Sequence, residues 1–361
     1  MRVLMVSNLW PPEILGGAER MAGALADRLE AAGHEVGVVT LAPPAGTALD
    51  PRVVATVPAF PYPIRDAPTE PAPRRALFHA ADLHRRATAR ALDYAFAELR
   101  PDVVHSHAVQ GLSTVALTHP ARRGYAHVHT IHDYWLLCQR NSLVRRDGTP
   151  CDALCTGCAL VSGVRNASVR RAAPDVLLAV SKAVALAHER LPWARDRLRV
   201  LYNPVEVVAA ARQRRAPGAP VTFGYLGRLA ADKGVVTLLA AFARSFPAGD
   251  AGARLLVAGR GPLERDVRST ANAEYRGWVD GAEKEALLAE VDVVVVPSEW
   301  PDPAPLVVNE ARARGIAVVG ARSGGIPELV APECEPLLFP AGDVPALSDR
   351  LVRAAAAPPV V

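Results

Sequence analysis

Short apolar runs alternate with helical periodicity along most of the chain. Residues 3–7 form an apolar run, apolar side chains then recur every four residues over 21–29, and residues 36–40 form the next run. That order predicts a strand, a helix and a strand. Because parallel strands covered by helices on both faces appear as continuous apolar runs, the first half is predicted to be one α/β domain. Its further strands are expected at residues 102–105, 126–131, 175–180 and 198–202.

A second series of the same kind follows a stretch rich in alanine, arginine and proline. This stretch, residues 209–220, lacks apolar periodicity and is predicted to be a linker. The predicted fold class is α/β, with two Rossmann-like domains, residues 1–208 and 221–361, facing a central cleft. In the second domain, strands are expected at residues 221–226, 254–258, 275–279, 292–296 and 317–320, and helices at 234–246 and 283–291.

Six prolines make residues 58–73 an expected extended loop. The stretch after it carries Leu77, Ala81, Leu92 and Leu99 on one face of a helix, with arginines elsewhere. A solvated polar face over a core stripe is the ordinary interpretation. The alternative is a basic amphipathic helix that contacts an anionic membrane surface or an acidic acceptor.

The composition is that of a folded globular protein, since half of the 361 residues are apolar and 22% are charged. A net charge of +4 gives no wide basic surface for nucleic acid, so small-molecule partners are expected. No apolar run approaches the length of a membrane helix, and a cytoplasmic location is predicted. Only three lysines occur against 38 arginines, so each lysine is of interest: Lys182, Lys233 and Lys284.

Two cations lie in a predicted strand-to-helix turn of the second domain. Arg228 follows Gly227, and Lys233 precedes Gly234. Cations beside a helix N-terminus, with glycines that permit close approach, form a site for a diphosphate; solvated loop cations are the alternative. Further along, Glu310 falls within an apolar helix, where a carboxylate can accept hydrogen bonds from ribose hydroxyls or lie on the solvated surface.

Four of the five cysteines occur within 21 residues, in the spacing C-x12-C-x3-C-x2-C. In a cytosolic protein such clustering favours a metal over disulfides, and four thiolates suit a structural zinc. Buried or free thiols are the alternative interpretation. A third is a redox or radical enzyme, because the last three cysteines match the spacing of clusters that activate S-adenosylmethionine. The predicted zinc ligands, in an insertion over residues 138–158, are Cys138, Cys151, Cys155 and Cys158.

Nine short motifs occur in order over nearly the whole chain. They are Gly16-Gly17-Ala18-Glu19-Arg20, His132-Asp133, Val180-Ser181-Lys182, Asn203-Pro204-Val205, Gly227-Arg228 to Lys233-Gly234, Gly259-Arg260-Gly261-Pro262, Pro297-Ser298, Glu310-Ala311 and Gly324-Gly325-Ile326-Pro327-Glu328. With them the chain resembles the retaining nucleotide-sugar glycosyltransferases of the GT-B fold, family four. The resemblance implies transfer of a sugar from a nucleoside-diphosphate sugar to an acceptor hydroxyl, with retained anomeric configuration and no catalytic cofactor.

The resemblance also implies roles for individual residues. Arg228 and Lys233 would neutralise the leaving diphosphate, Glu310 would hold the ribose, and His132 would lie against the donor sugar. The absence of an Asp-x-Asp motif is in keeping with cations in place of a metal. The remaining donor-binding positions implied are Gly16, Gly17, Gly227, Gly259, Val279, Ser323, Gly324, Gly325 and Ile326.

The chain departs from the family pattern in two places. The family's first glutamate, eight residues before Glu310, is replaced by Asp302, which is expected to contact hydroxyls of the transferred sugar, with Glu299 as the neighbouring alternative. The sequence also ends at Val361, without the family's longer tail. These two departures motivate a further hypothesis, a non-catalytic sugar-nucleotide binder.

Overall fold

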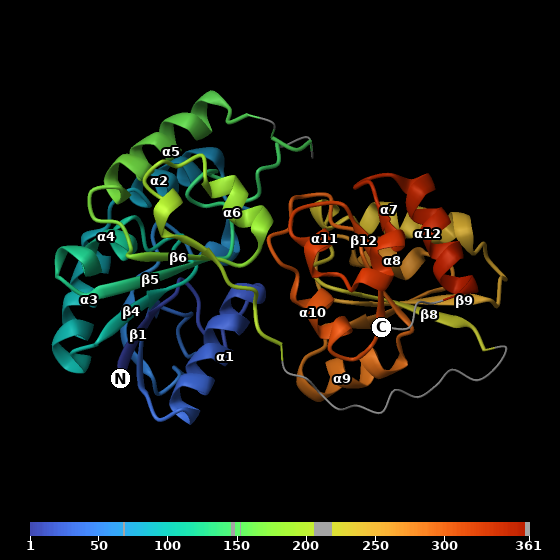
Figure 1. Cartoon of the computed structure of the whole chain (residues 1–361), viewed down its shortest axis with the longest axis horizontal. Helices are drawn as coiled ribbons and strands as arrows, with labels where there is room; N and C mark the ends of the chain where they lie inside the picture. Colours follow the sequence, from blue (N-terminus) through green and yellow to red (C-terminus); the bar gives the residue numbers. More distant parts are fainter. Residues whose placement is uncertain (68, 146–148, 152, 206–218, 358–361) are drawn as a thin grey trace. The chain divides into compact units, whose positions relative to one another are not determined.

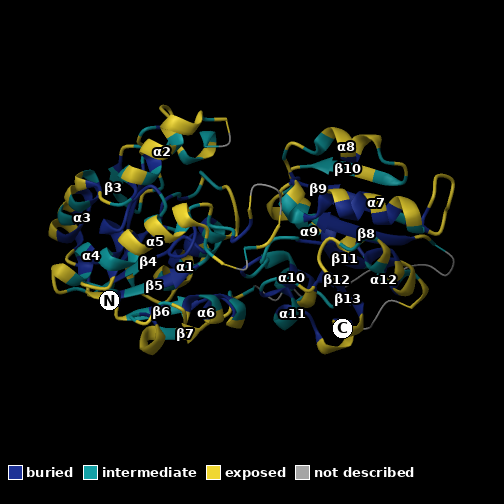
Figure 2. Ribbon diagram, turned by 90° about the horizontal axis from the view of Figure 1, so that it is seen from above, coloured by how far each residue is buried: buried dark blue, intermediate teal, exposed yellow. Residues whose placement is uncertain are grey.

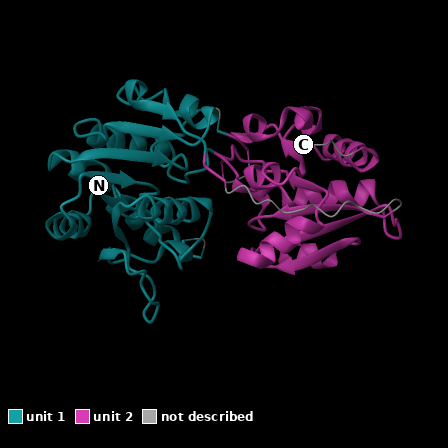
Figure 3. Cartoon of the chain, turned by 60° about the horizontal axis from the view of Figure 1, so that its bottom comes forward, with its two compact units in different colours: residues 1–143, 151–202 teal, residues 144–150, 203–361 magenta. Residues whose placement is uncertain are grey.

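The computed structural model describes residues 1–67, 69–145, 149–151, 153–205 and 219–357. The chain divides into two compact units, which Figure 3 distinguishes by colour. The first comprises residues 1–143 and 151–202, and the second comprises residues 144–150 and 203–361. Most of the predicted linker, residues 209–218, lies outside the described residues.

The first unit is built on a seven-stranded parallel sheet in the order β3-β2-β1-β4-β5-β6-β7 (Figure 1). Four of the five residues of β1 are buried, as the apolar run predicts for a central strand covered on both faces. The strands are β1 (Arg2–Val6), β2 (Glu35–Leu41), β3 (Val53–Val57), β4 (Val103–Ser106), β5 (Ala126–Ile131), β6 (Val176–Ala179) and β7 (Leu198–Val200).

Helices connect these strands and cover the sheet. Their exposed faces and the buried strands are visible in Figure 2. The α-helices are α1 (Gly17–Ala31), α2 (Ala72–Ala81), α3 (Arg86–Leu99), α4 (Val115–Arg122), α5 (Thr156–Val169) and α6 (Lys182–His188), with 3-10 turns η1 (Ile64–Asp66) and η2 (Arg195–Arg197).

The second unit repeats the architecture with a six-stranded parallel sheet in the order β10-β9-β8-β11-β12-β13. A cluster of Phe223, Phe242 and Phe246, with ring centroids 5.1–5.9 Å apart, packs helix α7 against the central strand β8. The strands are β8 (Val221–Leu226), β9 (Ala253–Ala258), β10 (Ala273–Gly277), β11 (Val293–Val296), β12 (Ala317–Ala321) and β13 (Leu338–Phe339). The helices are α7 (Val235–Ser245), α8 (Glu264–Ser269), α9 (Gly281–Glu290), α10 (Leu306–Arg312), α11 (Ile326–Leu329) and α12 (Val344–Ala356), with 3-10 turns η3 (Ala231–Lys233) and η4 (Pro332–Leu337).

The arginine-rich stretch differs from its prediction. It forms two helices, α2 and α3, because the chain turns at residues 82–85. Leu77 is 48% exposed whereas Leu92 is fully buried, so the expected single apolar face is wrong. Arg85 is itself buried and donates to the carbonyl oxygens of Gly111 and Pro58 at 2.6 Å each. The proline-rich loop before it also contains η1.

Two strands were not anticipated. β3 is an edge strand whose residues are mostly half-buried, although four of its five residues are apolar, and β13 has only two residues. β10 lies two residues before its predicted position, which leaves Val279 in the loop that follows. Within the described part of the chain, no helix is long and apolar enough to span a bilayer.

Candidate active site

The turn after β8 holds the predicted cation pair of the second unit. The hydroxyl of Tyr225, on β8, donates to the Arg228 carbonyl oxygen at 2.7 Å and fixes the start of the turn. The Arg228 guanidinium is half exposed and pairs with Asp232 at 2.5 Å. Lys233 ends the turn, immediately before α7. Loops at the carboxyl ends of parallel strands are where ligands bind in such sheets, so both cations are placed to meet an anion.

Lys233 forms an ion pair with Asp302, the residue that was expected to contact the transferred sugar. Its Nζ lies 2.6 Å from Oδ2 of Asp302 and 4.8 Å from the centroid of the Trp300 ring. The hydroxyl of Ser298 donates to the same carboxylate oxygen at 3.2 Å. Asp302 is buried, with a side chain 6% exposed, whereas that of Lys233 is 22% exposed. The structure therefore makes Asp302 the anionic partner of Lys233.

The loop after β12 packs directly on the backbone of Asp302. Gly324 has a φ of +54°, and a Cβ placed there would lie 2.2 Å from the Asp302 carbonyl oxygen. The Gly325 amide donates to that oxygen at 2.8 Å, and the Ser323 hydroxyl donates to the Trp300 carbonyl at 2.6 Å. The Ile326 amide donates to the Ser323 carbonyl at 3.2 Å. The structure thus brings Gly324 and Gly325 against Asp302, and the amides of Gly325 and Ile326, two of the expected phosphate-binding amides, donate to carbonyl oxygens of the chain.

Glu310, the predicted ribose ligand, lies on α10 and forms an ion pair with Lys284 on α9. The Lys284 Nζ is 2.7 Å from Glu310 Oε1, and both side chains are about four-fifths buried. Sequence reasoning singled out Lys284 only for its rarity, because nothing in the spacing of residues 284 and 310 indicates that they meet. The ion pair with the lysine holds the carboxylate in one orientation.

Gly227, which follows β8, and Gly259, which follows β9, bring the turns after these two strands together. Gly259 has a φ of +146°, and a Cβ there would lie 1.8 Å from the Gly227 carbonyl oxygen, so only glycine fits. The Gly227 amide donates to the Ala258 carbonyl at 3.0 Å, and the Gly259 amide to the Gly277 carbonyl at 2.7 Å. Val279 is half-buried and packs against the core of the unit. The predicted glycines therefore bring the turns after β8 and β9 into backbone contact.

In the first unit, His132 directly follows β5 and lines a small hollow with about 240 Å³ of empty space, including open solvent. Its Nε2 is 3.0 Å from Nδ1 of His107. Burial lowers the pKa of His132 to about 3, which keeps the ring neutral at neutral pH. Asp133 lines the same hollow, and burial raises its pKa to about 6.

Gly16 and Gly17 lie where the chain enters α1. The Gly16 amide, which was expected to bind phosphate, donates to Oε2 of the buried Glu19 at 2.8 Å in this structure. Burial raises the pKa of Glu19.

A buried ion pair that sequence reasoning missed supports the segment after His132. Asp82 accepts from the Trp135 indole at 2.7 Å and from the Gly111 amide at 2.7 Å, and it lies 3.5 Å from Arg165. The Arg165 guanidinium also donates to the Trp135 carbonyl and lies 4.0 Å from the Trp135 ring centroid. Three chain segments far apart in sequence are joined in this way, and no local pattern indicates it.

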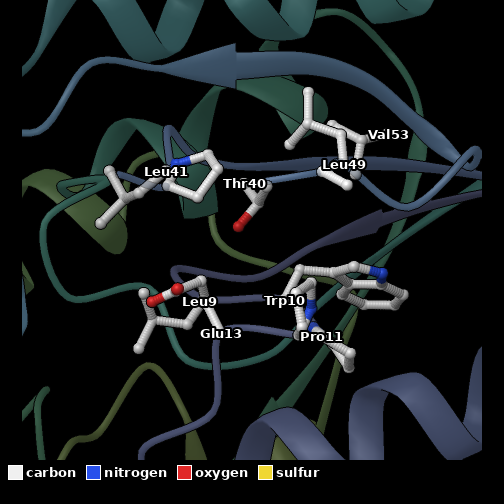
Figure 4. A pocket seen from close by; sticks show the side chains of 11 residues that line it. Leu9, Trp10, Pro11, Glu13, Thr40, Leu41, Leu49 and Val53 are labelled. Carbon is white, nitrogen blue, oxygen red and sulfur yellow. The ribbon is translucent and has the colours of Figure 1, made fainter. Parts of the chain in front are cut away.

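A second hollow of the first unit lies beside Trp10, with about 290 Å³ of empty space, including open solvent (Figure 4). Most of its walls are apolar, and the Trp10 indole donates to Asp50 at 3.1 Å. Such walls suit an uncharged group better than a phosphate. They comprise Leu9, Trp10, Pro11, Pro12, Glu13, Thr40, Leu41, Pro43, Ala48, Leu49 and Val53.

The four clustered cysteines are not gathered into one metal site. Cys138 is buried, Cys155 is exposed at the start of α5, and Cys151 and Cys158 are half-buried. A hydrogen bond to Cys158 lowers the pKa of the Cys155 thiol. Across the described ranges, no three His, Cys, Asp or Glu side chains are placed to hold a metal ion, so zinc stays a prediction from the sequence.

Known proteins provide an independent comparison. The model "Glycosyltransferase Family 4" matches residues 15–208, and the model "Glycosyl transferases group 1" matches residues 220–356. A glycogen synthase of Mycobacterium tuberculosis is 28% identical over 91% of this chain and 80% of its own length.

The fold is shared with solved structures. Sucrose-phosphate synthase from Thermosynechococcus elongatus superposes with a TM-score of 0.73 at 23% identity, over 99% of this chain and 90% of that one. Anabaena HepE in complex with UDP-glucose gives 0.67 at 18% identity, over 99% and 90%. These likenesses and the two parallel sheets establish the predicted α/β fold with two Rossmann-like domains, the GT-B fold. Since the family models together match most of the chain, it belongs to the glycosyltransferase family that they describe.

Proposed function

We propose that this glycosyltransferase transfers a sugar from a nucleoside-diphosphate sugar to an acceptor hydroxyl, with retention of the anomeric configuration. The observation that carries the proposal is the arrangement around Lys233, where two cations, a buried carboxylate and backbone turns meet at the carboxyl edge of the second sheet. The structure of HepE with UDP-glucose supports this class of donor.

In the proposed reaction, negative charge grows on the departing diphosphate as the glycosidic bond breaks. Lys233 and Arg228 are the cations placed to stabilise that charge, which makes a metal ion unnecessary. Before the donor binds, Asp302 and Asp232 pair with them, so the diphosphate competes with or joins these carboxylates. Glu310, oriented by Lys284, accepts hydrogen bonds from the ribose hydroxyls.

We propose that His132 contacts the donor sugar and that the hollow beside Trp10 receives an uncharged part of the acceptor. Its apolar walls support this assignment. The pathway we favour is the synthesis of a natural product or a surface glycan.

The test is a thermal-shift screen with UDP, ADP, GDP and dTDP, followed by turnover of the matching sugar donors. We expect one nucleotide to stabilise the chain, and NMR of the product to show the donor's anomeric configuration. An inverted product refutes retention. Nucleotide binding with neither transfer nor donor hydrolysis would favour the non-catalytic binder. For Lys233→Ala we expect the rate of the chemical step to fall more than donor affinity, since the charge it stabilises grows in the transition state.

A further inference from the structure

Five histidines of the first unit occur on or directly after two adjacent strands, and the proposed function uses only His132. His105 and His107 come from β4 and its end, with ring centroids 4.3 Å apart. The His107 and His132 centroids are 5.3 Å apart, with the rings stacked. The group also includes His127 and His129 of β5. His107 lines the hollow beside His132 and is only 2% exposed.

The bond between His107 Nδ1 and His132 Nε2 couples the proton positions of the two rings. Burial lowers the pKa of both histidines far enough that each is neutral at neutral pH. A neutral imidazole carries one N–H, so one ring must donate and the other must accept. Two arrangements exist, and they place the remaining proton of His132 on different atoms.

The other nitrogen of His107 distinguishes the two arrangements. Its Nε2 is buried and has no hydrogen-bond partner among the described residues. If His107 accepts at Nδ1, its proton lies on Nε2 as an orphaned N–H; if it donates, Nε2 keeps only an unused lone pair. Orphaned buried donors are the rarer and costlier case.

His188 provides an internal precedent. Its Nδ1 lies 2.8 Å from the Val184 carbonyl oxygen, which can only accept, so the proton is on Nδ1. The Nε2 of this buried ring also has no partner within the described ranges. A bare buried Nε2 is therefore a state that this unit tolerates.

We infer that His107 is a positioning residue that donates from Nδ1 to His132 Nε2 and thereby keeps the His132 proton on Nδ1. Within the part of the chain that the structure describes, His132 makes no hydrogen bond through Nδ1. Its Nδ1–H is thus available to an oxygen acceptor, and on the proposed function, on which this assignment of a ligand rests, that acceptor is a hydroxyl of the donor sugar.

Long-range ¹H–¹⁵N NMR of the full chain labelled with ¹⁵N-histidine tests the proton position directly. We expect the His132 signal, assigned by its loss in His132→Asn, to show the Nδ1–H tautomer, with His188 as the internal reference. An Nε2–H tautomer in the unaltered chain would overturn the inference, whether or not the chain transfers sugar.

Three variants of His107 test the role by activity. The Nδ2 of an asparagine matches the position of Nδ1, whereas a glutamine amide matches Nε2, and leucine carries neither. We expect kcat/KM to fall about tenfold or more in His107→Leu and His107→Gln and to recover largely in His107→Asn. The matched control is His119→Asn. His119 lies outside the group of five histidines, and its ring bonds Asp93 at 2.8 Å.

The activity results separate a positioning role from a structural one. Thermal stability should change little in His107→Leu, because the variant removes the orphaned Nε2 together with the hydrogen bond to His132. Equal activity of the asparagine and glutamine variants, or activity losses that track stability, would contradict the positioning role. Inactivity of the unaltered chain with every donor would refute the proposed function alone and leave the tautomer result standing.

Discussion

The ion pair between Lys233 and Asp302 leads to a prediction in which turnover falls while nucleotide affinity is unchanged or rises. In the free chain the Lys233 charge is already compensated at 2.6 Å by a carboxylate that is almost fully buried. A diphosphate that takes up the same charge must weaken this pair. Asp302→Asn keeps the shape of the side chain and removes its charge, so it frees Lys233 for the nucleotide.

The magnitude follows from the burial of the pair. Exposed pairs contribute up to about 1 kcal/mol, and breaking a fully buried pair costs about 3–5 kcal/mol. Because Lys233 is partly exposed, weakening its pair with Asp302 should cost the diphosphate about 1–1.5 kcal/mol. In Asp302→Asn this cost is removed. Affinity for the nucleoside diphosphate should therefore be unchanged or rise by up to about tenfold. Turnover should fall about tenfold or more, because Lys233 loses the partner that orients it toward the leaving group.

Isothermal titration calorimetry with the nucleoside diphosphate and initial rates with the sugar donor measure the two effects. The matched control is Glu290→Gln, which removes the charge of a carboxylate in an exposed pair with Arg276 at 2.9 Å. A loss of nucleotide affinity with unchanged turnover in Asp302→Asn would refute the reasoning. Asp302→Glu should also lower activity, because the close contact of Gly324 with the Asp302 backbone prevents the loop from moving to fit a longer side chain.

Three further predictions concern other parts of the chain. Glu310→Ala should weaken nucleoside-diphosphate binding by about 1.5–3 kcal/mol, and Lys284→Met should weaken it less, since it removes the partner and not the acceptor; unchanged titrations in folded variants would exclude Glu310 from the site. Arg165→Met should lower the free energy of unfolding by about 3–5 kcal/mol in urea titrations, because it leaves the buried Asp82 carboxylate without its cation. Adding Asp82→Asn should recover part of this loss, and a loss below about 1 kcal/mol would show that the Arg165–Asp82 pair does not stabilise the unit. Elemental analysis of protein purified without chelator should find about one zinc per chain, lost when Cys138 and Cys158 are replaced by serine; iron with a visible absorption band would favour the redox alternative, and no metal would refute the metal site.

The sequence predicted the fold well because buried parallel strands produce a strong local signal. The apolar run at residues 221–226 coincides with β8, where five of the six positions are buried. The strand expected at residues 126–131 coincides with β5, although His127 and His129 interrupt its apolar residues. The half-buried edge strand β3 was missed although four of its five residues are apolar. The prediction of one arginine-rich helix was wrong because periodicity alone does not show that the chain turns at Asp82. The Asp82 carboxylate accepts buried hydrogen bonds from Gly111 and Trp135.

The places of the candidate site residues in the fold were predictable from the sequence, but their contacts were not. Glycine-flanked cations after a strand indicate an anion site on chemical grounds, and Arg228 and Lys233 do lie at the carboxyl edge of the sheet. The partners of the site residues depend on tertiary structure. Lys284 reaches Glu310 from a different helix, and His107 reaches His132 across adjacent strands, 25 residues apart in the sequence.

These contacts change how the proposed site functions. Each predicted charged ligand of the second unit is bonded to an oppositely charged side chain: Lys233 to Asp302, Arg228 to Asp232, and Glu310 to Lys284. Side chains paired in this way are oriented before a ligand arrives, which reduces the entropy lost on binding. On the proposed function, a donor can bind them only if it displaces the internal partner or shares the side chain with it. Removing such a partner should therefore separate affinity from rate, and the Asp302 variants measure that separation at the charge closest to the chemistry.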